Sequence, residues 1–594
     1  MNGSSTVSES TQCSKTDTPS DDGSNGAGAE KGSPHVFNEQ TNFVPRRTII
    51  TIFLACASLD LLALIDQTTL AASLSIISND LAAGDETLWI AGGYFVTSTC
   101  FQLLYGRFSD IWSRKVILYI GLVIFFIGSL ASSLARTAIE LIVFRALSGI
   151  GGGGLITLGQ LIVSDVVPLR ERGKYQGILG SVVALANGIG PVIGGSLASI
   201  SKGSWRWIFR LNLPLTVLAI LCVKFFMPLR KVEGNWRAKL RTIDFTGAFL
   251  ALGGTVVLML GLAWGGEYPW NSIQVVTSLV VGVCVSLAFV LWQWKGASTP
   301  LIPMHIFKSR LVNGACLTMF INGWNSVVQL YYIPTFYQLA YGYSATKAAS
   351  LLLPVVLVQT VGSSLSGLFV SWAGRYRECI LLGWVIWAIG LGLYSTLDSS
   401  SGLGKQIGYG LLTGAGVGNT LQPALIAIQA GVERREMAVV TSFRNFLRNL
   451  GGTLGITTAG VILHNVLVSS FSSLNLSDSE ARRLLRSPDT YLATLSESEA
   501  SRVRSILIPS YQKGFRIIFL IGAGTAALAF FLAVFLIPQV ALKRPDDDML
   551  KEEGKKRVQV SKNRSVQDKV FGAIFLLILN TDECLYWFLN HPNA

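Results

Sequence analysis

Residues 106–115 of the chain read G-R-F-S-D-I-W-S-R-K, a charged loop between two long apolar stretches. A weaker copy occupies residues 367–375, where the sequence is G-L-F-V-S-W-A-G-R. Glycine opens both copies, a small or acidic residue follows four positions later, and arginine follows eight positions later. We infer from this recurrence that one half of the chain repeats the other.

The chemistry of the first copy predicts a role at a helix junction. Gly106 lacks a Cβ and permits close helix approach, and Asp110 can accept hydrogen bonds at a helix end. Arg114 and Lys115 are expected to stay on the cytoplasmic side of a membrane. We predict that this loop is a conformational switch, which latches the halves by charge contacts that Ser371 of the second copy cannot reproduce.

Composition places the chain in a lipid bilayer. Half of the 594 residues are hydrophobic, only 14% are charged and 60 are glycine, whereas soluble domains carry about 25% charged residues. The net charge of +13 lacks basic runs interleaved with aromatics. It indicates lysine and arginine kept on the cytoplasmic face, not a nucleic-acid partner.

Residues typical of enzymes and metal sites are sparse. The eight cysteines are scattered singly and the four histidines form no catalytic or metal-binding pattern. We therefore expect no metal, no cofactor and no enzymatic activity.

Fourteen apolar stretches are long enough to cross a bilayer core of about 30 Å. The short loops assigned to the cytoplasm hold eighteen lysines and arginines, against five on the other face. This asymmetry favours an even number of spans with both termini cytoplasmic. The predicted spans are 48–75, 88–106, 116–134, 139–165, 175–200, 207–228, 244–264, 272–294, 312–334, 346–372, 379–397, 405–430, 437–463 and 515–537.

A second repeat fixes the expected architecture. Residues 145–153, R-A-L-S-G-I-G-G-G, match residues 410–418, G-L-L-T-G-A-G-V-G. Two six-helix bundles are implied, and spans 244–264 and 272–294 are surplus helices between them. The predicted parts are a disordered cytoplasmic tail 1–45, an N-terminal bundle 46–230, a linker with two helices 231–300, a C-terminal bundle 301–538 containing an outer loop 464–514, and a cytoplasmic tail 539–594 with an apolar patch of unknown role at 570–589.

The loop 106–115 resembles the G-x-x-x-D-x-x-G-R-[RK] loop between helices 2 and 3 of the major facilitator superfamily, with Ser113 in place of the second glycine. This resemblance implies a transporter that rocks two rigid halves around a central site.

The run 186–195, A-N-G-I-G-P-V-I-G-G, is similar to a helix 5 sequence that marks proton-driven exporters in that superfamily. Gly190, Pro191, Gly194 and Gly195 carry the match. Small residues four apart also suit ordinary tight helix packing, which is the alternative.

Residues 65–74, I-D-Q-T-T-L-A-A-S-L, resemble a helix 1 motif of the fourteen-span drug/proton antiporter branch, as found in fungi. The segments 205–214 and 262–270 are also similar to that branch, so the resemblance extends over nearly the whole membrane region.

Charged residues inside spans are costly and mark candidate sites. We predict that Asp66 couples protons or orients the substrate; a hydrogen-bond acceptor at a helix end near the outer side is the alternative. Asp60 is the competing proton carrier. The family resemblance links Arg145 to proton transfer, and a structural ion pair is its alternative.

A polar stripe in the span 312–334 and a basic residue in the span 437–463 are candidates for the substrate cavity. Either substrate contact or hydrogen bonding between helices explains the stripe. Arg448 suits an anionic cargo, although pairing with a buried acid explains it equally well. The predicted cavity residues are Asn187, Asn322, Trp324, Asn325, Gln329, Tyr332 and Arg448.

The outer loop 464–514 contains two predicted capping boxes, Ser477 with Glu480 and Ser496 with Glu499, each opening a short amphipathic helix. Asn475 begins an N-x-[ST] triplet and is a candidate glycosylation site.

These features predict a proton-coupled exporter of a small organic compound, such as a secondary metabolite, a glycolipid, an organic acid or a toxicant. It would work as a monomer in the cell membrane, or alternatively in the vacuolar membrane. The competing functions are an importer of amino acids or iron chelates, and a transporter-like receptor without flux.

Overall fold

The computed structural model describes residues 46–542 apart from 82, 84–85, 202, 228–242, 266–267, 399 and 472–494. This part of the chain is helical and contains no strand, as predicted. Its long helices are α1 (Arg46–Leu81), α2 (Thr87–Ile111), α3 (Arg114–Leu134), α4 (Ala138–Val166), α5 (Arg172–Ser199), α6 (Arg206–Phe226), α8 (Phe245–Trp264), α9 (Ile273–Leu291), α10 (Arg310–Tyr341), α12 (Leu353–Ala373), α13 (Arg377–Tyr394), α14 (Leu403–Ala430), α15 (Met437–Phe471) and α18 (Glu497–Leu536); a short helix α11 (Ala345–Ser350) precedes α12.

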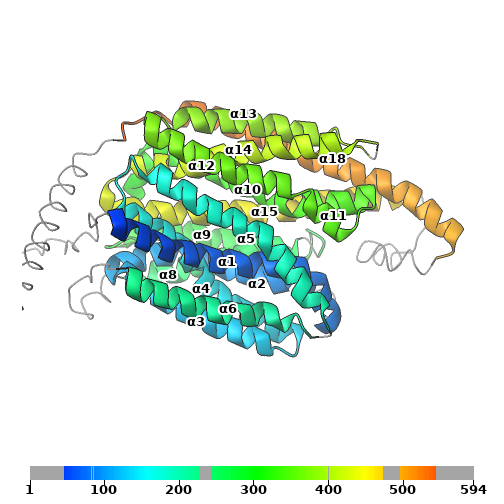
Figure 1. Ribbon diagram of the computed structural model, residues 1–594, viewed down its shortest axis with the longest axis horizontal. Coiled ribbons are helices and arrows are strands. Elements are labelled where there is room, and N and C mark those ends of the chain that lie inside the picture. Colours follow the sequence, from blue (N-terminus) through cyan, green and yellow to red (C-terminus); the bar gives the residue numbers. More distant parts are fainter. Residues whose placement is uncertain are drawn as a thin grey trace, which may run out of the picture. The chain divides into compact units, whose positions relative to one another are not determined.

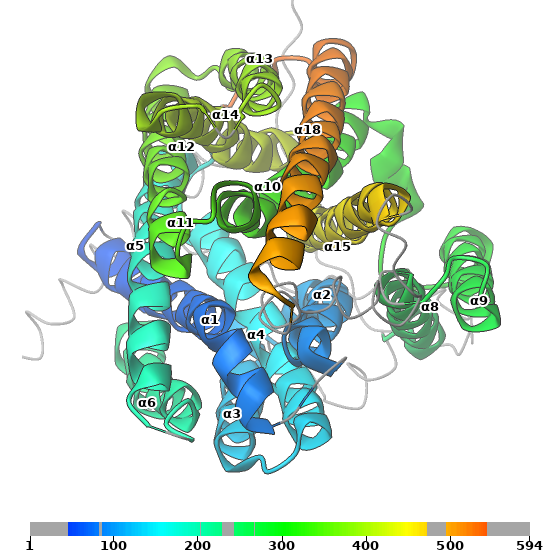
Figure 2. The ribbon, with the colours of Figure 1, turned by 90° about the vertical axis from the view of Figure 1, so that its right-hand side faces the viewer.

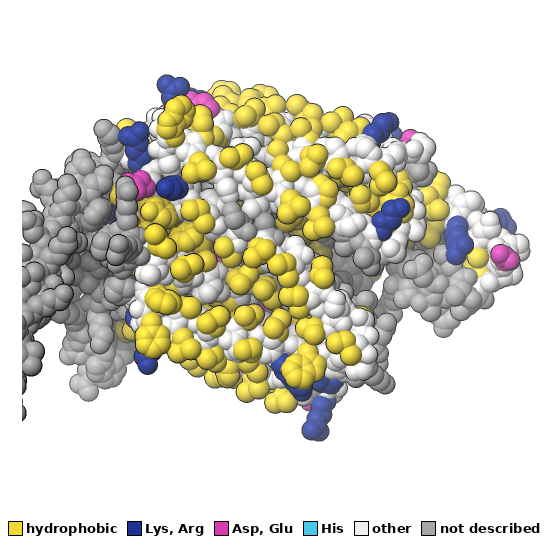
Figure 3. Space-filling view, in the orientation of Figure 1, with side chains coloured by type: hydrophobic (Ala, Val, Ile, Leu, Met, Phe, Trp, Pro, Cys, Tyr) yellow, Lys and Arg dark blue, Asp and Glu magenta, His cyan; other side chains and the backbone are white. Residues whose placement is uncertain are grey.

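Every one of the predicted apolar stretches coincides with a helix. Among the described residues, 11 helices are long and apolar enough to cross a membrane. Helices α2, α5 and α10 are as long, with 25, 28 and 32 residues, but carry more polar and small side chains. The total of fourteen spans, and the side on which each terminus lies, stay predictions. On the face drawn in Figure 3, hydrophobic side chains cover the middle of the helices, and charged side chains lie towards their ends.

The long helices pack as two groups. Helices α1 to α6 contact one another, and so do α10, α12, α13, α14, α15 and α18 (Figure 1). The groups meet where α5 packs against α12 and α2 packs against α15. Figure 2 shows the surplus pair, α8 and α9, beside α2 and α15, where α8 contacts both groups.

The glycine repeat occupies equivalent positions in the two bundles. A Cβ on Gly149 of α4 would lie 2.4 Å from a carbonyl oxygen of α2, and one on Gly414 of α14 would lie 2.3 Å from a carbonyl oxygen of α12. Four residues on, Gly153 and Gly418 approach the same two helices just as closely. The repeated glycines therefore bring the backbones of the central helices into contact in both halves.

The last span begins well outside its predicted bounds. Ser496 and Glu499 form the predicted capping box, with the Ser496 side chain accepting from the Glu499 amide and the Glu499 carboxylate accepting from the Ser496 amide. The helix that they open is not short: α18 continues for 40 residues and becomes the last span. Asn475 and the Ser477–Glu480 pair lie outside the described residues, as do most of both terminal tails.

Candidate functional site

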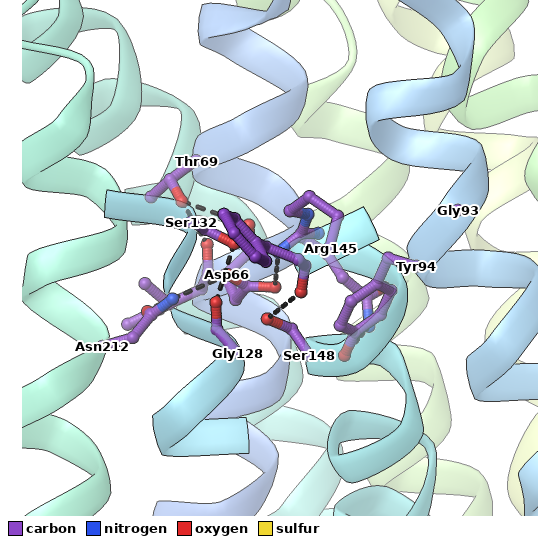
Figure 4. A network of polar contacts seen from close by, with 12 residues as sticks. Asp66, Thr69, Gly93, Tyr94, Gly128, Ser132, Arg145, Ser148 and Asn212 are labelled. Atoms are coloured by element: carbon purple, nitrogen blue, oxygen red, sulfur yellow. Dashed lines mark hydrogen bonds and ion pairs between the residues drawn. The ribbon is translucent and has the colours of Figure 1, made fainter. Parts of the chain in front are cut away.

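A buried ion pair joins α1 and α4 in the middle of the N-terminal bundle. Arg145 of α4 donates to the carboxylate of Asp66 in α1 at 2.7 Å, and the two side chains are 1% and 0% exposed. Asn212 of α6 donates its amide to the other Asp66 oxygen at 2.6 Å. Figure 4 shows the three side chains converging from three helices. Each oxygen of Asp66 therefore has a donor, and only one of these donors is charged.

Two aromatic rings also pack against the Arg145 guanidinium. The Tyr94 ring of α2 lies 4.5 Å from its central carbon and the Phe209 ring of α6 lies 5.7 Å from it. The Arg145 Nε has no hydrogen-bond partner among the described residues. Asp66 lies well inside the 36-residue helix α1, so the alternative of a helix-end acceptor is wrong. The acid paired with Arg145 is Asp66.

The second candidate acid, Asp60, has a different environment. Its side chain is only 4% exposed, and within the described chain its Oδ1 has no hydrogen-bond partner. A Cβ on Gly159 of α4 would lie 3.4 Å from that oxygen. Asp60 is thus a buried carboxylate beside the glycine-rich part of α4, without the arginine that accompanies Asp66.

The helix 5 motif brings α5 against α1. A Cβ on Gly190 would lie 1.9 Å from the Thr68 hydroxyl, and one on Gly194 would lie 2.2 Å from the Thr69 carbonyl oxygen. These glycines serve close packing next to the Asp66 turn, whereas a Cβ on Gly195 would meet nothing within 4 Å. The side chains of Asn187 and Pro191 lie outside the described residues.

The first copy of the repeated loop combines an ion-pair network with a close backbone contact. Arg114 binds Asp110 at 2.6 Å and Asp165 of α4 at 2.8 Å, and Lys115 donates to the carbonyl of Met227 after α6 at 2.9 Å. These contacts lie inside the N-terminal bundle. Gly106 makes the approach to the other bundle: a Cβ there would lie 3.1 Å from the Ala438 carbonyl oxygen of α15.

The second copy of the loop also joins the bundles, and Ser371 takes part through uncharged groups. The Ser371 hydroxyl accepts from the backbone amide of Lys174 at 2.9 Å, and the Arg170 guanidinium donates to the Ser371 carbonyl oxygen at 3.4 Å. A Cβ on Gly367 would lie 2.2 Å from the Gly173 carbonyl oxygen of α5. Ser371 thus contacts the other bundle through its hydroxyl and backbone groups, and the predicted latch by charge contacts of the first copy stays a prediction.

The polar stripe of α10 faces the inside of the C-terminal bundle. Asn322 donates to the Thr420 hydroxyl of α14 at 3.0 Å, and Asn325 donates to the Gly522 carbonyl of α18 at 3.2 Å. Trp324, Asn325 and Gln329 line a small pocket with residues of α13, α15 and α18, and Tyr332 donates to a carbonyl of α15 at 3.2 Å. Hydrogen bonding between helices therefore accounts for most of this stripe.

Arg448 of α15 lies beside that stripe without an acid. It donates to the Asn322 side-chain oxygen at 3.0 Å and to the Ser326 hydroxyl at 3.4 Å. No carboxylate lies within ion-pair distance of Arg448 in the described part of the chain. Within the described residues, Arg448 therefore has no buried acid partner.

The repeated loop, the paired bundles and the buried charge pair agree with one family. Residues 56–456 match the model of the Major Facilitator Superfamily. The chain belongs to this superfamily. The resemblance predicted from the loop 106–115 is thereby confirmed, and the members to which the chain is similar are membrane transporters.

Several curated fungal transporters are similar over most of their length. The chain is 33% identical to Citrate exporter 1 of Yarrowia lipolytica over 510 residues, covering 85% of this chain and 75% of that protein. It is 31% identical to the MFS-type transporter gkaD of Penicillium citrinum, covering 85% and 87%. It is 29% identical to the efflux pump FUS6 of Gibberella moniliformis, covering 87% and 92%.

Solved structures share the superfamily fold. The human organic anion transporter MFSD10 (TETRAN) superposes with a TM-score of 0.55 at 14% identity, covering 82% of this chain and 99% of that one. The proton:xylose symporter XylE superposes with a TM-score of 0.55 at 13% identity, covering 84% and 97%. At such identities the likeness shows the fold alone.

Two groups of functional candidates escaped the sequence reasoning. Asn212 completes the Asp66 site, and its only signal was one amide between apolar neighbours in α6. Arg172 of α5 crosses between the bundles to the Gln429 side chain of α14 at 3.0 Å. Gln429 in turn donates to the Ser164 hydroxyl of α4 at 2.9 Å, a contact between distant residues that no local pattern indicates.

Proposed function

We propose that this superfamily member is a proton-coupled antiporter that exports a small organic compound. The observation that carries the proposal is the Asp66–Arg145 pair, because an ionisable pair buried in a membrane bundle is costly and marks a coupling site. The Arg145 guanidinium stays charged at all working pH values. Asp66 is therefore the group of the pair that takes up and releases the proton.

Protonation of Asp66 would weaken its hold on two helices at once. A neutral carboxyl group loses the charge attraction to Arg145 of α4 and the charge-assisted bond from Asn212 of α6. The guanidinium would keep its contact with Tyr94 of α2. Proton binding would thus weaken the contacts of α1 with α4 and α6. It would thereby shift the balance between two conformations of the carrier.

The inter-bundle contacts support a cytoplasm-closed state. The approaches of Gly106 to α15 and of Gly367 to α5 lie at helix ends that the positive-inside rule assigns to the cytoplasm. In an antiport cycle, cargo would enter from the cytoplasm after these contacts open. A proton arriving from the outside would reset the carrier.

The names of the relatives favour export over import. Curated relatives that cover most of this chain are named an exporter and efflux pumps. For that reason we prefer export over uptake of amino acids or iron chelates, and over a receptor without flux. We place the protein in the cell membrane for the same reason, with the vacuolar membrane as the alternative.

Transport by reconstituted protein tests the coupling. Metabolite profiling of cells with and without the gene would identify the retained compound, which is then labelled and supplied outside proteoliposomes that contain the protein. An imposed proton gradient should drive its accumulation. Asp66→Asn, which cannot exchange a proton, should abolish the response to the gradient while leaving cargo–cargo exchange.

Asp60→Asn is the matched control, because it makes the same change in another buried acid of α1. It should leave the gradient response in place if Asp66 is the coupling residue. An Asp66→Asn protein that still concentrates cargo in proportion to the gradient would remove Asp66 from the mechanism. Loss of the response in Asp60→Asn alone would transfer the role to Asp60.

A further inference from the structure

Helix α15 carries two arginines one turn apart inside the C-terminal bundle. Arg444 is 2% exposed, and Arg448 keeps part of its surface exposed. Their spacing of four residues places them on one face of the helix, where like charges repel. Two neighbouring cations in a membrane helix require compensation.

Their hydrogen-bond partners are all neutral. Arg444 donates to the Asn445 side-chain oxygen and to the Leu421 carbonyl oxygen, each at 2.8 Å, and its Nε has no partner among the described residues. Among the described residues, the Arg448 guanidinium donates only to the side chains of Asn322 and Ser326. Neutral acceptors satisfy N–H groups but leave the two positive charges in place.

The acids of the described C-terminal bundle lie at or beyond the ends of its helices: Glu378 is in the first turn of α13, and Glu433 and Glu436 precede α15. Helices α10, α12, α14 and α15 contain neither aspartate nor glutamate, and α18 has only Glu497 and Glu499 in its first turn. The N-terminal bundle differs, because its buried Arg114 and Arg145 each bind a carboxylate within 2.8 Å. Neither Arg444 nor Arg448 has such a carboxylate partner among the described residues.

We propose that the cargo supplies the missing charge and is an organic anion whose carboxylate binds Arg448. This rests on the proposed function and names its substrate class. The partly exposed Arg448 makes the contact, since a guanidinium matches a carboxylate with two parallel hydrogen bonds. Asn322 orients the guanidinium from α10, and Arg444 adds its charge from one turn away. The N-terminal half would then handle the proton and the C-terminal half the anion.

Equilibrium binding to the purified full-length chain tests the inference without a proton gradient. The probes are citrate and benzoate, each compared with its neutral ethyl ester. At least one carboxylate should bind wild-type protein, and its ester should not. Arg448→Gln removes one charged hydrogen-bonding group and should raise the Kd by about 10- to 100-fold.

Arg516→Gln is the matched control, because Arg516 is an exposed arginine of α18 in the same bundle; it should leave the Kd unchanged. Arg448→Lys keeps the charge but loses the planar fork, so its Kd should fall between wild type and Arg448→Gln. This variant also serves if Arg448→Gln does not fold. The inference is overturned if neither carboxylate binds, if the esters bind equally well, or if substitutions of Arg448 leave the Kd as in wild type.

The two proposals fail separately. Carboxylate binding that depends on Arg448, together with transport that ignores the proton gradient, would overturn the antiport proposal alone. Gradient-driven export with no dependence on Arg448 would overturn the anion proposal alone.

Discussion

The glycines of α5 differ in how closely they approach α12 of the other bundle. A series of alanine substitutions along α5 tests whether this close approach holds the two bundles together. A Cβ on Gly173 would lie 2.3 Å from the Gly367 carbonyl oxygen of α12, and one on Gly177 would lie 2.9 Å from the Ser364 Cα. The nearest atom to a Cβ on Gly180 would be the Ser363 hydroxyl at 3.5 Å, and a Cβ on Gly188 would meet nothing within 4 Å. The seam is thus tight at the start of α5 and opens along it.

The sizes of the effects follow from these distances. At Gly173 the new methyl group would lie about 1 Å closer to the Gly367 carbonyl oxygen than ordinary van der Waals contact allows, and this backbone group cannot rotate aside. Overpacking of this kind costs about 1–3 kcal/mol, while alanine recovers up to about 1 kcal/mol of helix propensity. A net cost of about 1.4 kcal/mol that falls only on the closed seam would lower the closed-to-open ratio tenfold.

The assay measures the distance between the inner ends of the bundles. Spin labels at Val116 of α3 and Leu382 of α13, both exposed, would be placed in a cysteine-free background. Gly173→Ala should shift the distance distribution towards separated ends, Gly177→Ala should shift it less, and Gly180→Ala and Gly188→Ala should leave it as in wild type. The same distance distribution in Gly173→Ala and Gly188→Ala would show that the contact between α5 and α12 at Gly173 does not hold the bundles closed.

Two further changes test the junctions around these bundles. Asp110→Asn leaves Arg114 with Asp165 as its remaining ion-pair acid in the described contacts, so it should slow turnover several-fold with little change in KM for the cargo; normal turnover would reduce the loop to a topology signal. Asp244→Ala should lower thermal stability by about 1–2 kcal/mol, the usual value of a helix N-cap, because Asp244 accepts from Gly247 in α8 and from the side chains of Trp292 and Gln293. Asp244→Asn keeps one acceptor oxygen and should lose less thermal stability, as measured by the melting temperature in detergent. Equal melting temperatures of wild type and Asp244→Ala would show that this cap does not stabilise the α8–α9 pair.

Residues that act along one helix were predictable from the sequence. Apolar length located all the long helices, and the glycine repeat 145–153 and 410–418 predicted the matching approaches of α4 and α14. The charges of Asp66 and Arg145 were recognisable because they interrupt apolar spans. Their pairing was not, since sequence spacing says nothing about which face of α1 meets α4.

Contacts between distant helices account for what the sequence did not show. The spacing of Asn322, Asn325 and Gln329 showed that they share a face of α10, but not that this face looks into its own bundle. Ser371 was judged by its lack of charge, although its part in the seam depends on the amide that α5 presents to it. The length of α18 was missed because polar residues after Ser496 indicated a separate helix.

Helix α18 joins the last predicted span, without a break, to the exposed turns that precede it in the chain. Its 40 residues extend about 60 Å at 1.5 Å per residue, roughly twice the thickness of a bilayer core. Pro509 removes one backbone hydrogen bond without ending the helix. We therefore expect the exposed turns that begin at Glu497 to move with the C-terminal bundle, so that a binder attached to them would slow transport without contacting the cargo.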